Sequence, residues 1–127
     1  MSMSRVAYRV ATAADAPAIA ALHAESWRRT YRGVFREEFL LGDLERERLS
    51  TWRERLGSRS SSTQIIVAHD ADGVCGFVCA FERGDAEWGV FIDNLHVAPS
   101  HQGSGVGTAL LAAIAQWASR VQPLASP

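Results

Sequence analysis

Hydrophobic side chains recur every three or four residues in three stretches of the chain, and this spacing predicts three helices. The first predicted helix spans residues 13–29. The second spans residues 37–56, either continuously or with a break at Gly42. The third spans residues 105–120 and has a strong amphipathic pattern. The apolar face of this last helix consists of Val106, Leu110, Ala113, Ile114 and Trp117.

Shorter apolar runs predict four strands, at residues 8–10, 64–69, 74–81 and 88–97. The last three are expected to form a meander. The sequence Asp-Ala-Asp-Gly at residues 70–73 has hairpin-turn chemistry, because its glycine accepts a positive φ. The run 74–81 is apolar at nearly every position, which predicts burial on both faces. The predicted order is therefore β-α-α-β-β-β-α, in the α/β (α+β) class.

The remaining segments do not divide the chain into domains. Residues 30–35 and 57–63 are interpreted as internal loops, and residues 121–127 as an irregular tail with two prolines. A chain of 127 residues is long enough to bury a core of its own. We therefore expect a single domain over residues 1–127.

Composition and charge narrow the function. The chain is 47% hydrophobic and 21% charged, which is typical of soluble globular proteins. Its net charge of -1 gives no reason to expect nucleic acid or an anionic membrane as a partner. No apolar run approaches the roughly 20 residues of a spanning helix, and the N-terminus lacks the apolar stretch of a secretory signal. These features predict a cytoplasmic protein.

The two cysteines, Cys75 and Cys79, lie in one predicted strand. We expect them on the same face of that strand, about 13 Å apart at roughly 3.3 Å per residue. A disulfide needs Cα atoms within about 7 Å, which excludes a bridge between them there. We interpret both as small core side chains. The histidines are not predicted to cluster with them, so we expect no metal site. These histidines are His23, His69, His96 and His101.

Residues 94–107 combine the end of a strand, a turn with proline, a glycine-rich loop and the start of a helix. Glycines at positions 103, 105 and 107 let backbone N–H groups approach a ligand without obstruction by Cβ. The helix start adds unpaired N–H groups and the positive end of its dipole. Together these features favour an anion site suited to a pyrophosphate. A glycine turn that only caps the helix is the alternative.

Three phosphate-binding patterns compete for this loop. A Walker A loop requires Lys followed by Ser or Thr after its last glycine, but Thr108 directly follows Gly107 without a lysine. A G-x-G-x-x-G dinucleotide fingerprint fails because the sixth position from Gly103 is Thr108. The third pattern, Q/R-x-x-G-x-G/A, is matched by Gln102, Gly105 and Gly107.

That third pattern, with the segment before it, resembles the GNAT superfamily of acetyl-CoA-dependent N-acetyltransferases. The strand ending Leu95-His96-Val97-Ala98-Pro99 is similar to the Leu-x-Val-x-Pro ending common in that family. Residues 26–33 look like the first-helix segment of many members. The element order matches the family's first seven elements, so the resemblance covers nearly the whole chain. It implies a GNAT-like fold with a mixed, mostly antiparallel sheet flanked by helices.

The resemblance implies acetyl-CoA as cosubstrate. The N–H of Leu95 would polarise the thioester carbonyl, the backbone of Val97 would pair with the pantetheine arm, and the amides of residues 103–108 would hold the diphosphate. An acceptor amine would then attack directly in a ternary complex. The implied cofactor-binding residues are Leu95, His96, Val97, Gln102, Gly103, Ser104, Gly105, Val106, Gly107 and Thr108.

The attacking amine must first lose a proton, because a free primary amine has a pKa of roughly 10. Residues beside the implied thioester site are candidates for this step, although a plain surface position is the alternative for His96. The candidate catalytic residues are Leu95, Asp93, Asn94 and His96. Trp27 and Tyr31 are candidates for the acceptor cleft, with a packing role as the alternative for Tyr31.

A complete GNAT fold continues after the last predicted helix with further strands and a helix, and residues 121–127 do not supply them. Three interpretations stay open: a truncated or frameshifted product, pairing of the sheet edge at residues 88–97 with a second copy, or a binding remnant without catalysis. We expect a homodimer through that edge. The expected function is N-acetyl transfer to a small-molecule or peptide amine, and the alternative is a non-catalytic dimerising or CoA-binding module.

Overall fold

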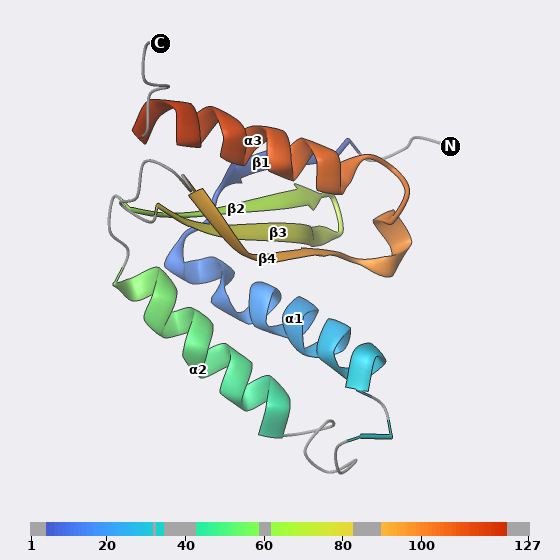
Figure 1. Cartoon of the computed structure of the whole chain (residues 1–127). Helices are drawn as coiled ribbons and strands as arrows, with labels where there is room; N and C mark the ends of the chain where they lie inside the picture. The colour runs from blue at the N-terminus through green and yellow to red at the C-terminus, as the bar shows by residue number, and fades with distance from the viewer. Residues whose placement is uncertain (1–4, 32, 35–42, 59–61, 83–89, 122–127) are drawn as a thin grey trace. The chain divides into compact units, whose positions relative to one another are not determined.

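The structure is a computed structural model that describes residues 5–31, 33–34, 43–58, 62–82 and 90–121. The chain falls into two compact units by its internal contacts. One unit, Ala11–Ser58, contains two long helices and is called the helical unit here. The other joins Met1–Val10 to Arg59–Pro127 and is called the sheet unit (Figure 1). That the whole chain forms one domain stays a prediction.

The helical unit begins with a short 3-10 helix, η1 (Ala13–Asp15), that leads into α1 (Ala16–Tyr31). The carboxylate of Asp15 accepts the N–H of Thr12 at 2.8 Å, which fixes the start of the helix. The prediction that residues 30 and 31 lie in a loop is wrong. The Thr30 hydroxyl donates to the carbonyl of Ser26 at 3.0 Å, one turn earlier, so the helix continues. Residues 32 and 35 of that predicted loop lie outside the described residues.

The second helix of this unit is α2 (Leu44–Gly57). Residues 37–42 of its predicted span, with the break at Gly42, lie outside the described residues. Trp52 is fully buried, and its indole N–H donates to Nδ1 of His23 on α1 at 3.1 Å. Leu44 packs with Ala24 in a small core beside the Trp27 ring. These contacts hold α1 against α2 within the helical unit.

The sheet unit contains four strands, β1 (Ala7–Val10), β2 (Thr63–Asp70), β3 (Gly73–Glu82) and β4 (Val90–Val97). Strands that are neighbours in sequence are neighbours in space, and all three pairings are antiparallel. This order confirms the predicted meander and the α+β class. Gly73 has a φ of 120° in the turn between β2 and β3, in agreement with its hairpin chemistry. The described strands leave β1 and β4 at the two edges of the sheet.

The helix α3 (Val106–Val121) runs along one face of this sheet (Figure 1). Its apolar side and the strands share one core, which consists of Ile66, Ala68, Cys75, Val78, Ala80, Val106, Leu110, Ile114 and Trp117. Residues 75–80 of β3 are all buried, which confirms the prediction for this run. Gly76 allows α3 to approach β3 closely, because a Cβ there would lie 3.2 Å from Val106 Cγ1 and 3.1 Å from the His96 carbonyl oxygen.

A β-bulge in β3 changes which side chains share a face. The register between β2 and β3 shifts after Ala68, so no residue of β2 lies opposite Cys75 in the strand pairing. Cys75 therefore turns into the core under α3, whereas Cys79 pairs with Ile65 outside that core cluster. The prediction that the two cysteines share a face is wrong for this reason. Their interpretation as buried, free side chains is confirmed.

Among the residues that the structure describes, no helix has both the length and the apolar character needed to cross a membrane.

Candidate functional site

A short 3-10 helix, η3 (Pro99–His101), and a glycine-rich turn join β4 to α3. This helix was not predicted, although a proline at a first helical position is a recognised signal for it. The Ser104 hydroxyl donates to the carbonyl of His101 and tightens the turn. Gly103 and Gly105 have φ values of 81° and 90°, a region that residues with a Cβ rarely adopt. The backbone path therefore requires glycine at these two positions.

The start of α3 exposes a group of unpaired backbone donors. The first helical bond there runs from the N–H of Ala109 to the carbonyl of Gly105, at 3.0 Å. Five N–H groups nearby have no acceptor among the described residues. They belong to Gly103, Gly105, Val106, Gly107 and Thr108. This cluster carries the positive end of the helix dipole, so it is suited to hold an anion.

These donors border a pocket of about 400 Å³ whose lining includes Val97, Gln102, Thr108 and the three loop glycines. Gly107 differs from the other two glycines. A Cβ at that position would meet Val97 Cγ2 at 3.7 Å, which is an ordinary van der Waals contact. The space and backbone at Gly107 would therefore accept an alanine, as the Gly-or-Ala position of the pattern allows.

At the end of β4, some backbone N–H and C=O groups point away from β3, toward the edge of the sheet. The N–H of Ala98 donates to the carbonyl of Cys75 at 2.8 Å, and this bond spans the pair formed by Gly76 and Val97. That pair is therefore of the non-hydrogen-bonded kind, in which the backbone groups point outward. Leu95 lies two residues earlier and has the same orientation. The N–H of Leu95 and both polar backbone groups of Val97 thus face away from β3.

Gln102, which matches the first position of the loop pattern, turns back toward β4. Its side-chain Nε2 donates to the outward-facing carbonyl of Val97 at 3.1 Å. A carbonyl oxygen has two lone pairs, so this bond leaves one of them available. The contact connects the glycine loop to the strand edge, and it places both around one pocket.

The candidate residues on β4 lie in different surroundings. The register between β3 and β4 shifts so that Asp93 is an extra, exposed residue in a second bulge. Its carboxylate accepts a hydrogen bond from the side chain of Asn94 at 2.6 Å. The imidazole of His96 instead lies 5.3 Å from the ring of Phe77, measured between centroids. The side chain of Leu95 packs against the core under α3.

Trp27 and Tyr31 belong to the helical unit and are one turn apart on α1. Their ring centroids are 4.7 Å apart, with the planes tilted by 45°. The guanidinium carbon of Arg48 lies 5.7 Å from the centre of the Trp27 ring. Tyr31 is 37% exposed. The structure therefore brings these two aromatic residues together on one helix face.

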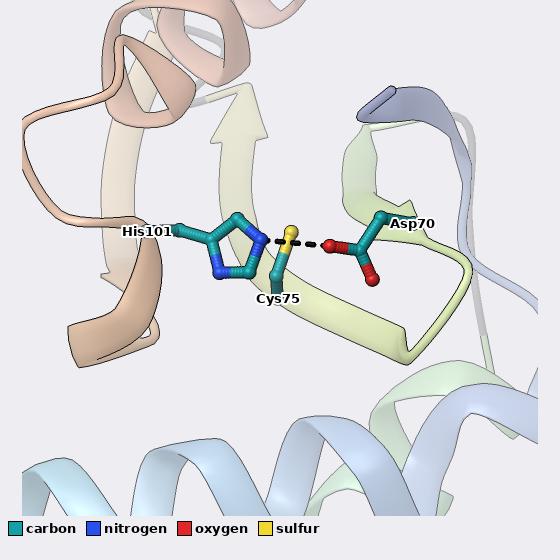
Figure 2. Close-up of side chains that lie close together, drawn as sticks. All are labelled: Asp70, Cys75 and His101. Atoms are coloured by element: carbon teal, nitrogen blue, oxygen red, sulfur yellow. Dashed lines mark hydrogen bonds and ion pairs between the residues drawn. The ribbon is translucent and has the colours of Figure 1, made fainter. Parts of the chain in front are cut away.

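One cluster was missed by the sequence analysis, and it involves His101. Nε2 of His101 lies 2.7 Å from Oδ2 of Asp70, a residue 31 positions away. Cys75 completes the group, since its Sγ and the two partner atoms all lie within 4.8 Å of one another (Figure 2). The prediction that no histidine lies close to the cysteines is therefore wrong. No spacing rule could have identified this group, because the bulge at Cys75 turns the thiol toward it.

Within this cluster, the pKa of the Asp70 carboxyl and the pKa of the Cys75 thiol are shifted in opposite directions. The pKa of Asp70 is lowered, mainly by the N–H of Asp72 and then by the hydrogen bond with His101. Burial raises the pKa of the Cys75 thiol, and the nearby Asp70 carboxylate raises it further. In this structure the thiol therefore stays protonated at neutral pH, and it donates to the carbonyl of Ala68 at 3.5 Å.

Residues 19–122 match the acetyltransferase (GNAT) family. No curated protein matches the chain by sequence.

Solved structures match the fold. The PaiA N-acetyltransferase from Thermoplasma acidophilum, solved with coenzyme A, has a TM-score of 0.75 at 16% identity, over 92% of this chain and 74% of that one. Ribosomal-protein-alanine N-acetyltransferase from Brucella melitensis biovar Abortus 2308 has a TM-score of 0.65 at 19% identity, over 93% and 74%. Aminoglycoside N-acetyltransferase AAC(6')-Iy, solved with CoA, has a TM-score of 0.70 at 21% identity, over 94% and 73%. These likenesses confirm the predicted GNAT-like fold.

Proposed function

Because the chain belongs to the acetyltransferase (GNAT) family, we propose that it transfers an acetyl group from acetyl-CoA to an amine by direct attack in a ternary complex. The observation that carries this proposal is the cluster of five unpaired N–H groups at the start of α3. We expect the reaction to occur in the cytoplasm, where free, buried cysteines such as Cys75 and Cys79 stay reduced.

In this proposal the glycine loop holds the diphosphate of CoA. The five amides would donate to phosphate oxygens, and the dipole of α3 would favour their negative charge. The pocket beside these amides, at about 400 Å³, offers space for the group. Because the donors are backbone groups, binding would depend on the path of the chain at Gly103 and Gly105 more than on side-chain chemistry.

The edge of β4 would receive the rest of the cosubstrate. The outward N–H and carbonyl of Val97 suit pairing with the amides of the pantetheine arm, as an added strand would pair. The outward N–H of Leu95 would then donate to the thioester oxygen. The amine attacks the carbonyl carbon and negative charge builds on that oxygen. The carbon–sulfur bond then breaks, the carbonyl re-forms as an amide, and CoA leaves as a thiolate that takes up a proton from solvent. Loss of one such fixed donor typically costs about 3 kcal/mol of transition-state stabilisation.

Three residues on β4 are proposed to assist removal of the amine proton, namely Asp93, Asn94 and His96. Of these, His96 has the side chain that ordinarily titrates near neutral pH, and its ring is only partly buried against Phe77. Asp93 is an exposed carboxylate on a bulge, which is a position that re-aims a side chain. A His96→Gln variant tests the first choice: kcat at saturating acetyl-CoA should fall about a hundredfold or more, and an unchanged kcat would exclude His96 as the base.

The acceptor is proposed to be a small molecule or a peptide that carries a primary amine. The structural neighbours include enzymes named for an aminoglycoside and for ribosomal-protein alanine, so this fold serves both kinds of acceptor. Trp27 and Tyr31 offer paired aromatic rings on α1 for contact with it. A panel of amines in a thiol-release assay would identify the class.

We also propose that two copies associate through β4. The bulge at Asp93 divides this strand, and Phe91 and Ile92 on the earlier half are 42% and 40% exposed. An edge strand with exposed apolar side chains is a template for pairing with another chain. Light scattering after size-exclusion chromatography should give a molar mass twice that of one chain. The Ile92→Lys variant should give the mass of one chain. Val10→Lys on β1 is the matched control and should leave the mass unchanged.

Calorimetric titration tests the main proposal. The protein should bind CoA and acetyl-CoA, and it should bind acetyl-pantetheine, which lacks the diphosphate, far more weakly. Equal affinity for the two thioesters would show that the loop is not a diphosphate site. If CoA binds but no amine promotes thiol release, the non-catalytic CoA-binding module would replace the enzyme.

A further inference from the structure

A cluster of three metal-ligating side chains lies beside the glycine loop, and its atoms already converge. We propose that Asp70, Cys75 and His101 form a binding site for a zinc ion, with a water as the fourth ligand. The three side chains come from the end of β2, from β3 and from η3, and they point toward one another (Figure 2). This inference replaces the expectation of no metal, which rested on sequence spacing alone.

The distances suit a small ion. The donor atoms Oδ2, Sγ and Nε2 all lie within 4.8 Å of one another. In a tetrahedral zinc site with bonds of about 2.0–2.3 Å, neighbouring ligand atoms lie about 3.3–3.8 Å apart. The hydrogen bond between Asp70 and His101, at 2.7 Å, would therefore open by less than about 1 Å. Side-chain rotation is sufficient for that change.

Two of the ligands are already oriented by their neighbours. The Nδ1 of His101 is hydrogen-bonded to the Ser100 hydroxyl at 2.8 Å, which leaves Nε2 directed at the cluster. The Oδ1 of Asp70 accepts the N–H of Asp72 at 2.9 Å, which leaves Oδ2 directed at the same point. Zinc ligands are commonly fixed by outer contacts of this kind. An ordinary surface ion pair does not require them.

The chemical types of the three ligands favour zinc over Mg²⁺ and Ca²⁺. A thiolate and an imidazole are soft or borderline ligands that zinc prefers, and Mg²⁺ and Ca²⁺ require oxygen sets instead. Cys75 is 3% exposed and the Asp70 side chain 5% exposed, so the ion would be largely shielded from water. Zinc binding would replace the thiol proton of Cys75, and that proton would be released to solvent.

Space for the fourth ligand lies next to the cluster. A pocket of about 480 Å³ borders Asp70 and His101, and Tyr8 and Ser104 also line it. His101 lines the pocket of the glycine loop as well. A bound ion would therefore fasten η3, which precedes the loop, to the ends of β2 and β3. We expect it to act as a structural clamp on the loop.

Cobalt titration of the untagged protein tests the site, because Co²⁺ bound to a thiolate gives an intense charge-transfer absorption in the near ultraviolet. Wild type should develop this band and saturate at one equivalent. Cys79→Ala should retain the band and Cys75→Ala should lose it; both variants leave one cysteine. His101→Gln should weaken cobalt binding at least tenfold, and His69→Gln should not. Absence of the band in wild type, or its survival in Cys75→Ala, would overturn the proposal.

Thermal unfolding gives a second readout that does not depend on colour. Equimolar zinc in excess of the dissociation constant should raise the Tm of wild type and of Cys79→Ala, since a ligand that binds only the folded chain stabilises it. The rise should be smaller in His101→Gln, because weaker binding stabilises the folded chain less. An equal zinc-induced rise in His101→Gln would also contradict the site. Neither measurement uses acetyl-CoA, so the result is independent of the proposed enzyme activity.

Discussion

The glycine loop before α3 and the Asp70–Cys75–His101 cluster lie side by side but are built in opposite ways. The loop is contiguous in sequence and exposes backbone N–H groups that have no acceptor among the described residues. The cluster draws side chains from three elements, and of its three residues only His101 also lines the pocket beside the loop. A backbone site depends on local conformation, whereas a side-chain site depends on how distant elements are brought together. The two regions should therefore respond to different kinds of mutation.

The largest expected effect is at Gly105. Gly105→Asp should reduce CoA affinity more than about a hundredfold, because a carboxylate would face the diphosphate and the φ of 90° disfavours any side chain. Gly105→Asn has nearly the same size and backbone strain without the charge, so it should retain measurable binding. Calorimetry on both variants separates the two causes. Equal loss in both would mean that conformation, not anion binding, explains the glycine.

Gly76 links the two regions through packing. Gly76→Ala should cost about 1–3 kcal/mol of unfolding free energy, because its Cβ would press on Val106 and Leu110 at 3.2 and 3.3 Å. Urea denaturation measures this loss. Gly57→Ala at the end of α2 has nothing within 4 Å of its Cβ and serves as the control, with little change expected. Unchanged stability in Gly76→Ala would contradict the close approach of α3 to β3.

Ser100 distinguishes the two regions, because its hydroxyl orients a ligand of the proposed zinc site and it is not one of the proposed CoA-binding residues. Ser100→Ala should weaken zinc binding about tenfold by releasing Nδ1 of His101. Ser100→Thr keeps the hydroxyl and should retain the affinity. CoA binding in metal-free buffer should be the same in both variants. A chelator competition assay gives the zinc affinities, and no difference between Ala and Thr would exclude the orienting role.

The smallest effect concerns charge at the start of α3. Thr108→Glu should weaken CoA binding a few-fold, since a charge near a helix end contributes about 0.3–1 kcal/mol. The same substitution should leave the Tm unchanged or raise it, because a negative side chain interacts favourably with the positive end of the helix dipole. Thr108→Gln is the uncharged control. Affinity and stability that fall together in Thr108→Glu would contradict an anion site at these amides.

The fold was predictable because most of its information is local. The amphipathic pattern of α3 and the apolar run of β3 each determine an element without help from distant residues. The end of α1 was missed because Thr30 is a weak helix former, and its hydroxyl nevertheless bonds the preceding turn. Bulges were missed for a different reason. An extra residue at Cys75 or Asp93 is visible only against a partner strand.

The same distinction applies to the sites. Gln102, Gly103 and Gly105 follow one another closely, so their joint role as a loop could be inferred from sequence. The contact of Asp70 with His101 joins positions 31 residues apart, and no periodicity connects them. The roles of the loop residues and of Asp93, Asn94 and His96 stay predictions until ligands are bound. The GNAT-like fold itself is confirmed by the solved structures.

The contact of Gln102 with Val97 has a consequence for handling the purified protein. Exposed edge strands promote fibrils and precipitates, and natural proteins reduce this tendency with bulges and charged side chains. On β4 the bulge carries a carboxylate at Asp93, and the Gln102 amide covers the last outward carbonyl. The bulge and the Gln102 contact thus both limit uncontrolled aggregation through this edge. Replacing Gln102 with alanine should shorten the time for which concentrated stocks stay clear.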